Sequence, residues 1–252
     1  MRTAPALSCQ NVRKAFDGKV AVQDISFEVH PGEVFGLLGP NGAGKTTFIR
    51  MAMDILRPDT GSVTILGRSS TDADSDRVGY LPEERGLYRR QKVLDVLDYF
   101  GRLKGLRGPA VKQAARAALE RVDLGSWADR KVQDLSKGMQ QKVQIAATLL
   151  HDPELVILDE PFAGLDPVNV RVVKDMIQER RARGRTVILS AHQMDMVEQL
   201  CDRIAMIHQG RLVLYGRLEE IKSRFPAREV VVQTVKTASL EEIFLRVVAE
   251  QA

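Results

Sequence analysis

Short apolar runs, each bounded by turn-forming or polar residues, are the clearest pattern along this chain. Four runs are nearly all apolar: Val34 to Leu38, Leu155 to Leu158, Thr186 to Leu189 and Ile204 to Ile207. Runs of this length and composition are typical of strands that are buried on both faces. Helical patterns separate them along the sequence, which favours crossover connections and a mostly parallel sheet. The pattern therefore predicts an α/β fold.

The first part of the chain has a different pattern, with shorter alternating segments. Leu7 to Val12 and Ala21 to Val29 read as two strands, and Asp17-Gly18 between them reads as a turn. Ser62 to Leu66 and Arg77 to Leu81 are further short strands. Beside the parallel sheet, we expect an antiparallel β subdomain that contains the hairpin turned at Asp17-Gly18.

Helical periodicity replaces the strand pattern from Lys92 to about Leu150. Strong helix formers continue it through Ala114 to Val122. The residues that share one face of its first helix are Val93, Leu94, Leu97 and Phe100. We therefore expect a helical subdomain inserted into the α/β core at about residues 85–150.

Two later segments carry helix-start signals. Asp166 and Pro167 fit the N-cap and first position of a helix. The apolar residues that we expect on one side of this helix are Val168, Val172, Val173 and Met176. After Gly216 the sequence predicts a small tail, with a strand at Val230 to Val232 and a helix opened by the capping box Ser239-Leu240-Glu241-Glu242. We divide the chain into a main domain, 1–220, and an α+β tail, 221–252.

Composition narrows the class of protein. The 252 residues carry a net charge of +4, but both signs are interspersed and no basic stripe with interleaved aromatics exists, so we expect no nucleic-acid partner. Cys9 and Cys201 lie far apart, which indicates neither a disulfide framework nor a metal site and suits a reducing compartment. The chain shows neither a signal-peptide pattern nor an apolar run of spanning length.

The strand at Val34 to Leu38 runs into a complete phosphate-binding loop pattern, GxxxxGK[ST], and a helix is predicted from Thr47 to Ile55. Glycines let backbone N–H groups close around phosphate oxygens, and the helix directs its positive end at the anion. The lysine charge acts on the outer phosphates and the threonine hydroxyl ligates Mg²⁺. The loop predicts a nucleoside triphosphate ligand and consists of Gly39, Pro40, Asn41, Gly42, Ala43, Gly44, Lys45 and Thr46.

Two carboxylates follow the buried strand that ends at Leu158. Asp159 is placed to reach the shell of a Mg²⁺ ion, and Glu160 to act as general base on an attacking water. A solvated turn is the alternative interpretation of such a pair. Lys45 and Thr46 in the same chain favour the catalytic one.

A third segment, Leu135 to Lys142, begins a helix that Ser136 is suited to cap. Gly138 permits a close approach of backbone. The positive end of this helix is suited to a second anion, although an ordinary capped helix has the same pattern.

These residues together resemble the ATP-binding subunits of ABC transporters. The segment Ser136, Lys137, Gly138, Met139 and Gln140 resembles the family's signature, and it precedes the Asp159-Glu160 strand as in the family. The resemblance extends from Leu7 to about Gly216. It implies ATP and Mg²⁺ as cofactors and two subunits that meet head to tail around two ATP molecules, so that the signature of one subunit acts on the nucleotide of the other.

The resemblance assigns further residues. Phe16 corresponds to the aromatic residue that stacks on adenine, and Thr47 completes the nucleotide site. Asp166 lies in the segment that resembles the D-loop, which joins the two sites across the dimer. His192 resembles the switch histidine that contacts the γ-phosphate. With Glu160 and Lys45 it forms the expected catalytic set.

One position departs from the family. Glu83 stands where the family has the glutamine that ligates Mg²⁺, so Glu83, Thr46 and Asp159 become the expected metal ligands. The neighbouring run to Tyr88 resembles the ATPase subunits of bacterial sodium and drug exporters.

The sequence thus predicts the ATPase subunit of an ABC transporter. We expect it at the cytoplasmic face of the membrane, bound to an integral membrane permease and paired with a second copy or a related ATP-binding chain. Export is the expected direction. Three alternatives are a soluble ABC-type ATPase, a small-molecule kinase and a nucleotide-gated binding module. The segment from Ser136 to Gln140 argues against the kinase.

Overall fold

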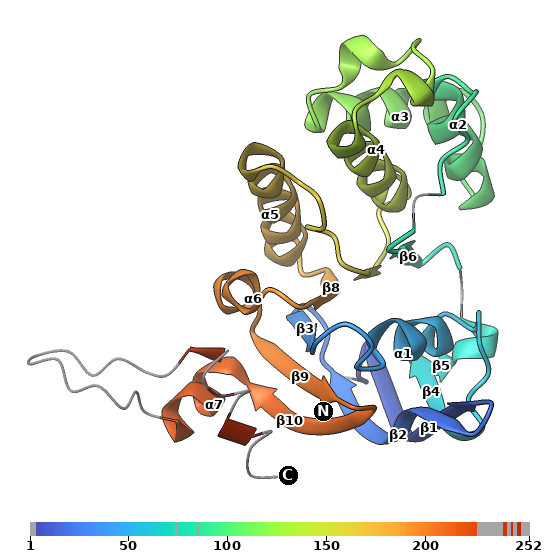
Figure 1. Ribbon diagram of the computed structural model, residues 1–252. Coiled ribbons are helices and arrows are strands. Elements are labelled where there is room, and N and C mark those ends of the chain that lie inside the picture. Colours follow the sequence, from blue (N-terminus) through green and yellow to red (C-terminus); the bar gives the residue numbers. More distant parts are fainter. Residues whose placement is uncertain are drawn as a thin grey trace, which may run out of the picture. The chain divides into compact units, whose positions relative to one another are not determined.

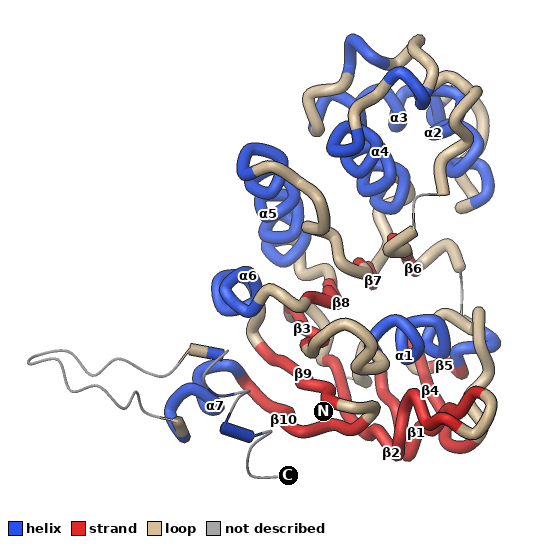
Figure 2. The backbone as a smooth tube through the Cα atoms, in the orientation of Figure 1, coloured by secondary structure: helices blue, strands red, loops and turns tan. Residues whose placement is uncertain are grey.

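The computed structural model describes residues 4–73, 75–84, 86–225, 239–240, 243 and 246–247. The chain divides into two compact units, 1–73 with 186–252 and 74–185, and each is described by itself. The labels in Figure 1 follow the chain, and Figure 2 shows its strands in red and its helices in blue.

The first unit contains a four-stranded antiparallel sheet. Its strands are β1 (Leu7–Phe16), β2 (Lys19–Val29), β4 (Thr60–Ile65) and β5 (Arg68–Ser69), in the order β2-β1-β4-β5 (Figure 2). Asp17 and Gly18 form the β1–β2 turn with φ angles of 47° and 81°. Positive φ at both central positions is the geometry that suits the twist of a hairpin. The predicted turn and antiparallel subdomain are confirmed.

A second set of strands in this unit carries the parallel pairing. β3 (Val34–Leu38) pairs in parallel with β8 (Thr186–Ala191) on one side and with β9 (Arg203–His208) on the other, and β10 (Arg211–Arg217) pairs antiparallel with β9. Within residues 4–225, the helices of this unit are α1 (Lys45–Ala52), α6 (Met194–Leu200) and α7 (Leu218–Arg224), with a 3₁₀ turn at Ser70–Asp72. All five residues of β3 are buried, as the continuous apolar run predicts.

Aromatic rings join the elements of the first unit into one core. The ring of Phe27 on β2 lies 5.3 Å from that of Phe35 on β3 and 5.0 Å from that of Phe48 on α1, measured between centroids. Tyr215 on β10 donates a 2.7 Å hydrogen bond to the carbonyl oxygen of Glu28. Because aromatic side chains bury large apolar areas, this cluster fixes β3 and α1 on the antiparallel sheet.

The second unit combines a short parallel pair with four helices. β6 (Val78–Leu81) pairs with β7 (Leu155–Leu158), and the helices are α2 (Val93–Leu103), α3 (Ala110–Arg121), α4 (Lys137–Leu149) and α5 (Pro167–Ala182), with 3₁₀ turns at Gly125–Trp127 and Val132–Asp134. Val93, Leu94 and Leu97 are buried in the core of α2, α3 and α4, and Phe100 packs against it. This is the apolar face that the sequence predicts.

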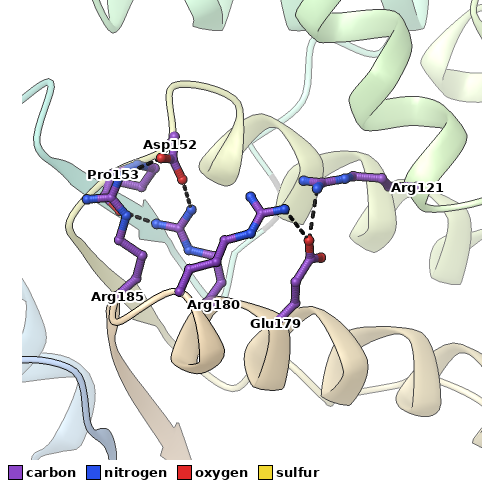
Figure 3. A network of polar contacts seen from close by, with 7 residues as sticks. Arg121, Asp152, Pro153, Glu179, Arg180 and Arg185 are labelled. Atoms are coloured by element: carbon purple, nitrogen blue, oxygen red, sulfur yellow. Dashed lines mark hydrogen bonds and ion pairs between the residues drawn. The ribbon is translucent and has the colours of Figure 1, made fainter.

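Charged residues join α5 to α3 and to the loop before β7 within the second unit (Figure 3). The Arg180 side chain, only 8% exposed, donates to the Asp152 carboxylate and to the carbonyl oxygen of Pro153. Arg185 donates to the other Asp152 oxygen at 2.5 Å. Glu179 accepts from Arg121 at 2.9 Å and from Arg183 at 2.5 Å.

Three expectations need correction or qualification. The helix predicted from Thr47 to Ile55 spans Lys45–Ala52, because Asp54 takes a left-handed φ of 53° and ends it. Val168, expected on the apolar side of α5, is 75% exposed in its first turn. The other three expected residues are confirmed, since Val173 is buried and Val172 and Met176 pack against the helical core, and Ile177 is a buried residue that the pattern missed. The predicted strand at Val230 to Val232 lies outside the described residues. Leu240, Ile243 and Val247 of the tail are buried with helical spacing.

Candidate functional site

The loop between β3 and α1 is shaped by two glycines that have backbone carbonyls beside them. Gly39 has a φ of 150°, and a Cβ there would lie 2.2 Å from the carbonyl oxygen of Ile207. Gly44 has a φ of 109°, and a Cβ there would lie 2.4 Å from that of Ala21. Since L-residues rarely adopt these φ angles and the carbonyls leave no room, only glycine fits either position.

Backbone hydrogen bonds fix this loop to its surroundings. Ala43 N–H donates to Pro40 O at 3.1 Å within the loop. Gly210, in the β9–β10 turn, donates to Ala43 O at 2.9 Å, and its own carbonyl accepts from Gln23 N–H of β2 at 2.7 Å. The loop conformation is therefore held by the β9–β10 turn, which β2 in turn anchors.

Lys45 lies inside the loop at the start of α1 and is 6% exposed. Its Nζ donates to Gly39 O at 2.7 Å and to Pro40 O at 3.3 Å. Thr46 and Thr47 are partly buried in the same turn, while Pro40, Asn41 and Gly42 are exposed. The loop thus combines a cation, hydroxyl groups and the N–H end of a helix, which together suit a phosphate.

Two further predicted residues belong to the first unit. Phe16 ends β1 with 46% of its surface exposed, and Lys14 Nζ lies 5.6 Å from its ring centroid. His192 directly follows β8, where Ala191 pairs with Leu38 of β3. Because of this pairing, His192 follows its strand at the same end of the sheet as the loop after Leu38, and its side chain is exposed. It also lines a cavity of about 460 Å³ together with residues of α6 and Ser239.

The carboxylates lie in the second unit, at the ends of a strand pair. Leu81 of β6 pairs with Leu158 of β7, so Glu83 and Asp159 follow neighbouring strand ends. Asp159 is fully buried, and its N–H donates to Leu81 O at 2.9 Å. Glu83 is exposed. Among the described residues, no three His, Cys, Asp or Glu side chains gather as metal ligands would.

Glu160 has an unusual backbone for its type. Its φ of 50° lies in the left-handed region, where a non-glycine residue costs roughly 1 kcal/mol or more. The bond from Ala163 N–H to Glu160 O, 3.1 Å long, closes the turn behind it. This turn directs the chain away from the strand directly after Asp159.

Ser136 caps α4 in the predicted way. Its Oγ accepts from Met139 N–H at 3.2 Å, and the side-chain amide of Gln140 donates to Leu135 O at 2.9 Å. Ser136 and Lys137 are exposed, while Gly138, Met139 and Gln140 are partly exposed. The electropositive end of a 13-residue helix therefore faces solvent in this subunit.

Asp166 caps α5, also in the predicted way. Its Oδ1 accepts from Asn169 N–H at 3.0 Å, and this hydrogen bond lowers the pKa of the Asp166 carboxyl. A carboxylate at this end of the helix is further favoured by the helix dipole.

Residues 22–163, more than half of the chain, match the family described as ABC transporter. The chain belongs to this family. Its ATP-binding subunits hydrolyse ATP for a transporter, and this chain is such a subunit, as the sequence predicts. No described helix of this ABC subunit is long and apolar enough to cross a membrane.

Individual relatives of this ABC subunit agree with the assignment. It is 45% identical over 86% of its length, and 79% of the relative, to the uncharacterized ABC transporter ATP-binding protein MJ1023 of Methanocaldococcus jannaschii. It is 36% identical over 95% of its length, and 77% of the relative, to the linearmycin resistance ATP-binding protein LnrL of Bacillus subtilis. A solved ATP-binding subunit of an ABC transporter superimposes with a TM-score of 0.86 at 28% identity, covering 96% of this chain and 99% of the other.

Two side chains near the signature were not found by sequence reasoning. Gln141 Nε2 donates to Pro161 O at 3.4 Å, next to Glu160. Asn169 Nδ2 donates to Asp166 Oδ2 at 2.5 Å. The three-residue spacing after the Asp166 cap is a local signal for Asn169. The Gln141 contact joins residues 20 positions apart, for which the sequence holds no local signal.

Proposed function

We propose that this subunit binds Mg-ATP in the loop from Gly39 to Thr47 and hydrolyses it with Glu160 as general base. The observation that carries the proposal is the loop itself, in which carbonyls exclude any Cβ at Gly39 and Gly44 and the cation of Lys45 is buried. Hydrogen bonds to Ala43, Pro40 and Gly39 hold the loop in this conformation without a ligand, which reduces the free energy that binding spends on ordering it. Phe16 offers an exposed ring on which adenine stacks.

The residues present fit a magnesium ion. Mg²⁺ is usually held by one or two carboxylates together with substrate phosphates, so a complete protein cage is not required. Buried Asp159 is the principal carboxylate, and Thr46 supplies a hydroxyl. Glu83 follows the strand end beside Asp159 and replaces the amide oxygen of other family members with a carboxylate. A Mg²⁺ ion held there would supply positive charge against the phosphate oxygens.

Each proposed catalytic residue has a different role. Glu160 takes a proton from the attacking water, which for a positioned base is worth about 10²- to 10⁴-fold in rate. Lys45 stabilises charge on the outer phosphates, and His192 contacts the γ-phosphate from the end of β8. The left-handed turn at Glu160 supports this role, because strained backbone concentrates at functional sites.

A second subunit completes each site. The solvent-facing end of α4, with Ser136, Lys137, Gly138, Met139 and Gln140, acts on the ATP held by its partner, and Asp166 links the two sites. Charge-assisted hydrogen bonds of this kind contribute about 1.5–3 kcal/mol each. Hydrolysis removes the γ-phosphate that they bind, so the pair opens. The partner is a second copy or a related ATP-binding chain.

Opening and closing drive an integral membrane permease, and the subunit works at the cytoplasmic face of the membrane. The aromatic surface of Tyr88 and Tyr99, whose rings lie 5.5 Å apart edge to face, is the proposed contact. Tyr88 is 51% exposed although it is a large aromatic residue. The name of one relative, the Nod factor export ATP-binding protein I of Burkholderia pseudomallei, supports export as the direction. Residues 1–220 form the ATPase domain in this proposal, with the helical subdomain at about 85–150, and 221–252 the tail.

The proposal is tested with Glu160→Gln in the purified subunit, with Glu219→Gln, an exposed glutamate of α7, as the matched control. We expect Glu160→Gln to lower ATP turnover by at least about 100-fold and to trap an ATP-bound dimer, because binding remains while proton removal is lost. Phosphate release and size-exclusion chromatography measure the two effects. Near-normal turnover would remove Glu160 from the base role, and a strictly monomeric ATP complex would exclude the paired site.

A further inference from the structure

Asn169 makes two contacts to the carboxylate of Asp166, and only one of them belongs to the helix cap. Its backbone N–H bonds Oδ1 at 3.0 Å, as any residue at this position can. Its side-chain Nδ2 donates to Oδ2 at 2.5 Å, which requires an amide. Together they fix both oxygens of the D-loop carboxylate.

The same amide lies against the signature. A Cβ built on Gly138 would lie 3.1 Å from Asn169 Nδ2 and 3.8 Å from Leu165 Cδ2. Gly138 is inside α4 and has no left-handed φ. Its backbone conformation therefore does not require glycine, and what its missing side chain provides is room for Asn169. The first turn of α4 therefore packs directly on the first turn of α5.

A third contact joins α4 to the segment that leads from Glu160 to α5. Gln141 is buried, and its amide donates to Pro161 O at 3.4 Å. Contacts at Pro161, Leu165 and Asn169 thus follow the segment along the beginning of α4.

From these contacts we infer that Asn169 is a positioning residue, which joins the D-loop to the signature within one subunit. Its side-chain Nδ2 holds the Asp166 carboxylate, and the same NH₂ group limits how closely Gly138 of α4 approaches. The inference rests on the proposed function, because Asn169 can affect ATP turnover only if the signature and the D-loop both act on the nucleotide. Asn169 itself touches no reacting atom in this scheme. It positions the Asp166 carboxylate and the first turn of α4, which act on the nucleotide in the proposed function.

A mere capping role predicts a different result from a positioning role. The cap uses the backbone N–H of Asn169, which every substitution except proline retains. Removal of the side-chain amide leaves that bond intact and removes only the contacts to Oδ2 and to Gly138. A change in turnover without a change in stability is therefore specific to positioning.

The first experiment compares Asn169→Ala and Asn169→Asp with the parent protein and with Arg171→Ala, an exposed residue two positions along the same helix. We expect Asn169→Ala to lower kcat roughly 3- to 30-fold with the ATP KM within about two-fold, since the phosphate loop is unchanged. Asn169→Asp should lower kcat further, because it places a second carboxylate beside Asp166. Parent-like kcat for Asn169→Ala, or a fall matched by Arg171→Ala, would overturn the inference.

The second experiment is a double-mutant cycle with Gly138→Ala. A methyl group at 138 meets the amide of Asn169, so Gly138→Ala should cost a smaller factor in kcat when residue 169 is alanine than in the parent. Factors that simply multiply would mean that the two residues act independently, which contradicts the inference. Thermal melting of each variant checks that the subunit stays folded.

The outcomes separate this inference from the function on which it rests. Suppose that Glu160→Gln abolishes turnover while the kcat factors of Gly138→Ala and Asn169→Ala simply multiply. The ATPase assignment then stands, and the positioning role of Asn169 is wrong. If Glu160→Gln leaves turnover unchanged, the proposed site itself fails whatever Asn169 does.

Discussion

His151 is a partly buried histidine near two cations, in the loop that follows α4. Its Nε2 lies 3.3 Å from Val78 O, and Lys104 Nζ donates to the same oxygen at 3.1 Å. Burial, the positive charge of Lys104 and that of Arg180 lower the pKa of His151 to about 4, against the opposing bond to Val78 and the charge of Asp76. The imidazole is therefore neutral in the folded protein at neutral pH.

We predict that this histidine makes the protein less stable in mild acid. In the unfolded chain a histidine titrates near pH 6.5. Between about pH 6.5 and 4, the imidazole is therefore protonated in the unfolded state but neutral in the folded state. The free energy of unfolding should fall as pH is lowered through this window. His151→Gln should reduce the fall because glutamine does not titrate, and its amide can still donate a hydrogen bond to Val78 O. Urea unfolding at pH 7 and pH 5 measures it. The same loss in both proteins would contradict the prediction.

Local chemistry explains which site residues the sequence could predict. Ser136 and Asp166 cap their helices as predicted, because a cap depends on residues three positions apart. The burial of His151 and the contact of Gly138 with Asn169 depend on elements that only the folded chain brings together. Neither could be predicted from spacing.

At the scale of elements, α5 is held at its C-terminal end by two ion-pair groups that differ in burial (Figure 3). The group around Asp152 contains Arg180, whose side chain is 8% exposed, whereas the group around Glu179 joins side chains that are all at least 44% exposed. Loss of a partner leaves a buried charge uncompensated in the first group only.

We predict that Asp152→Asn destabilises the protein by about 1–3 kcal/mol, because Arg180 keeps its charge in a buried place. Glu179→Gln, the same chemical change on exposed pairs, should cost less than about 1 kcal/mol. Guanidinium unfolding of the two variants beside the parent gives the comparison. If both variants lost the same free energy of unfolding, the burial of Arg180 would not be the cause of the destabilisation, and the prediction would be wrong.

Element types were more predictable than element ends. The apolar runs predicted β3, β7, β8 and β9, since a fully buried strand leaves a continuous pattern. β10 (Arg211–Arg217) was missed because its residues are only partly buried and its pattern is mixed. The end of α1 was placed too late, because a left-handed aspartate at 54 stops a helix without the usual glycine.

At the scale of the whole molecule, the second unit is one continuous stretch of chain while the first is made of two. We predict that a fragment of residues 74–185 retains its helical core when expressed alone, because α2, α3 and α4 bury their apolar faces on one another. A fragment of residues 1–73 should not fold, since β3 lacks both of its strand neighbours. Circular dichroism and cooperative urea unfolding distinguish the two results. An unfolded 74–185 fragment would contradict the prediction.

The pairing of β3 has a consequence for how a ribosome makes this protein. Val34 pairs with Val187, so β3 emerges long before the strands that cover its two edges have been translated. An apolar strand with open edges is a template for aggregation. The edges of β3 therefore stay open to pairing with other chains until residues 186–208 have left the exit tunnel.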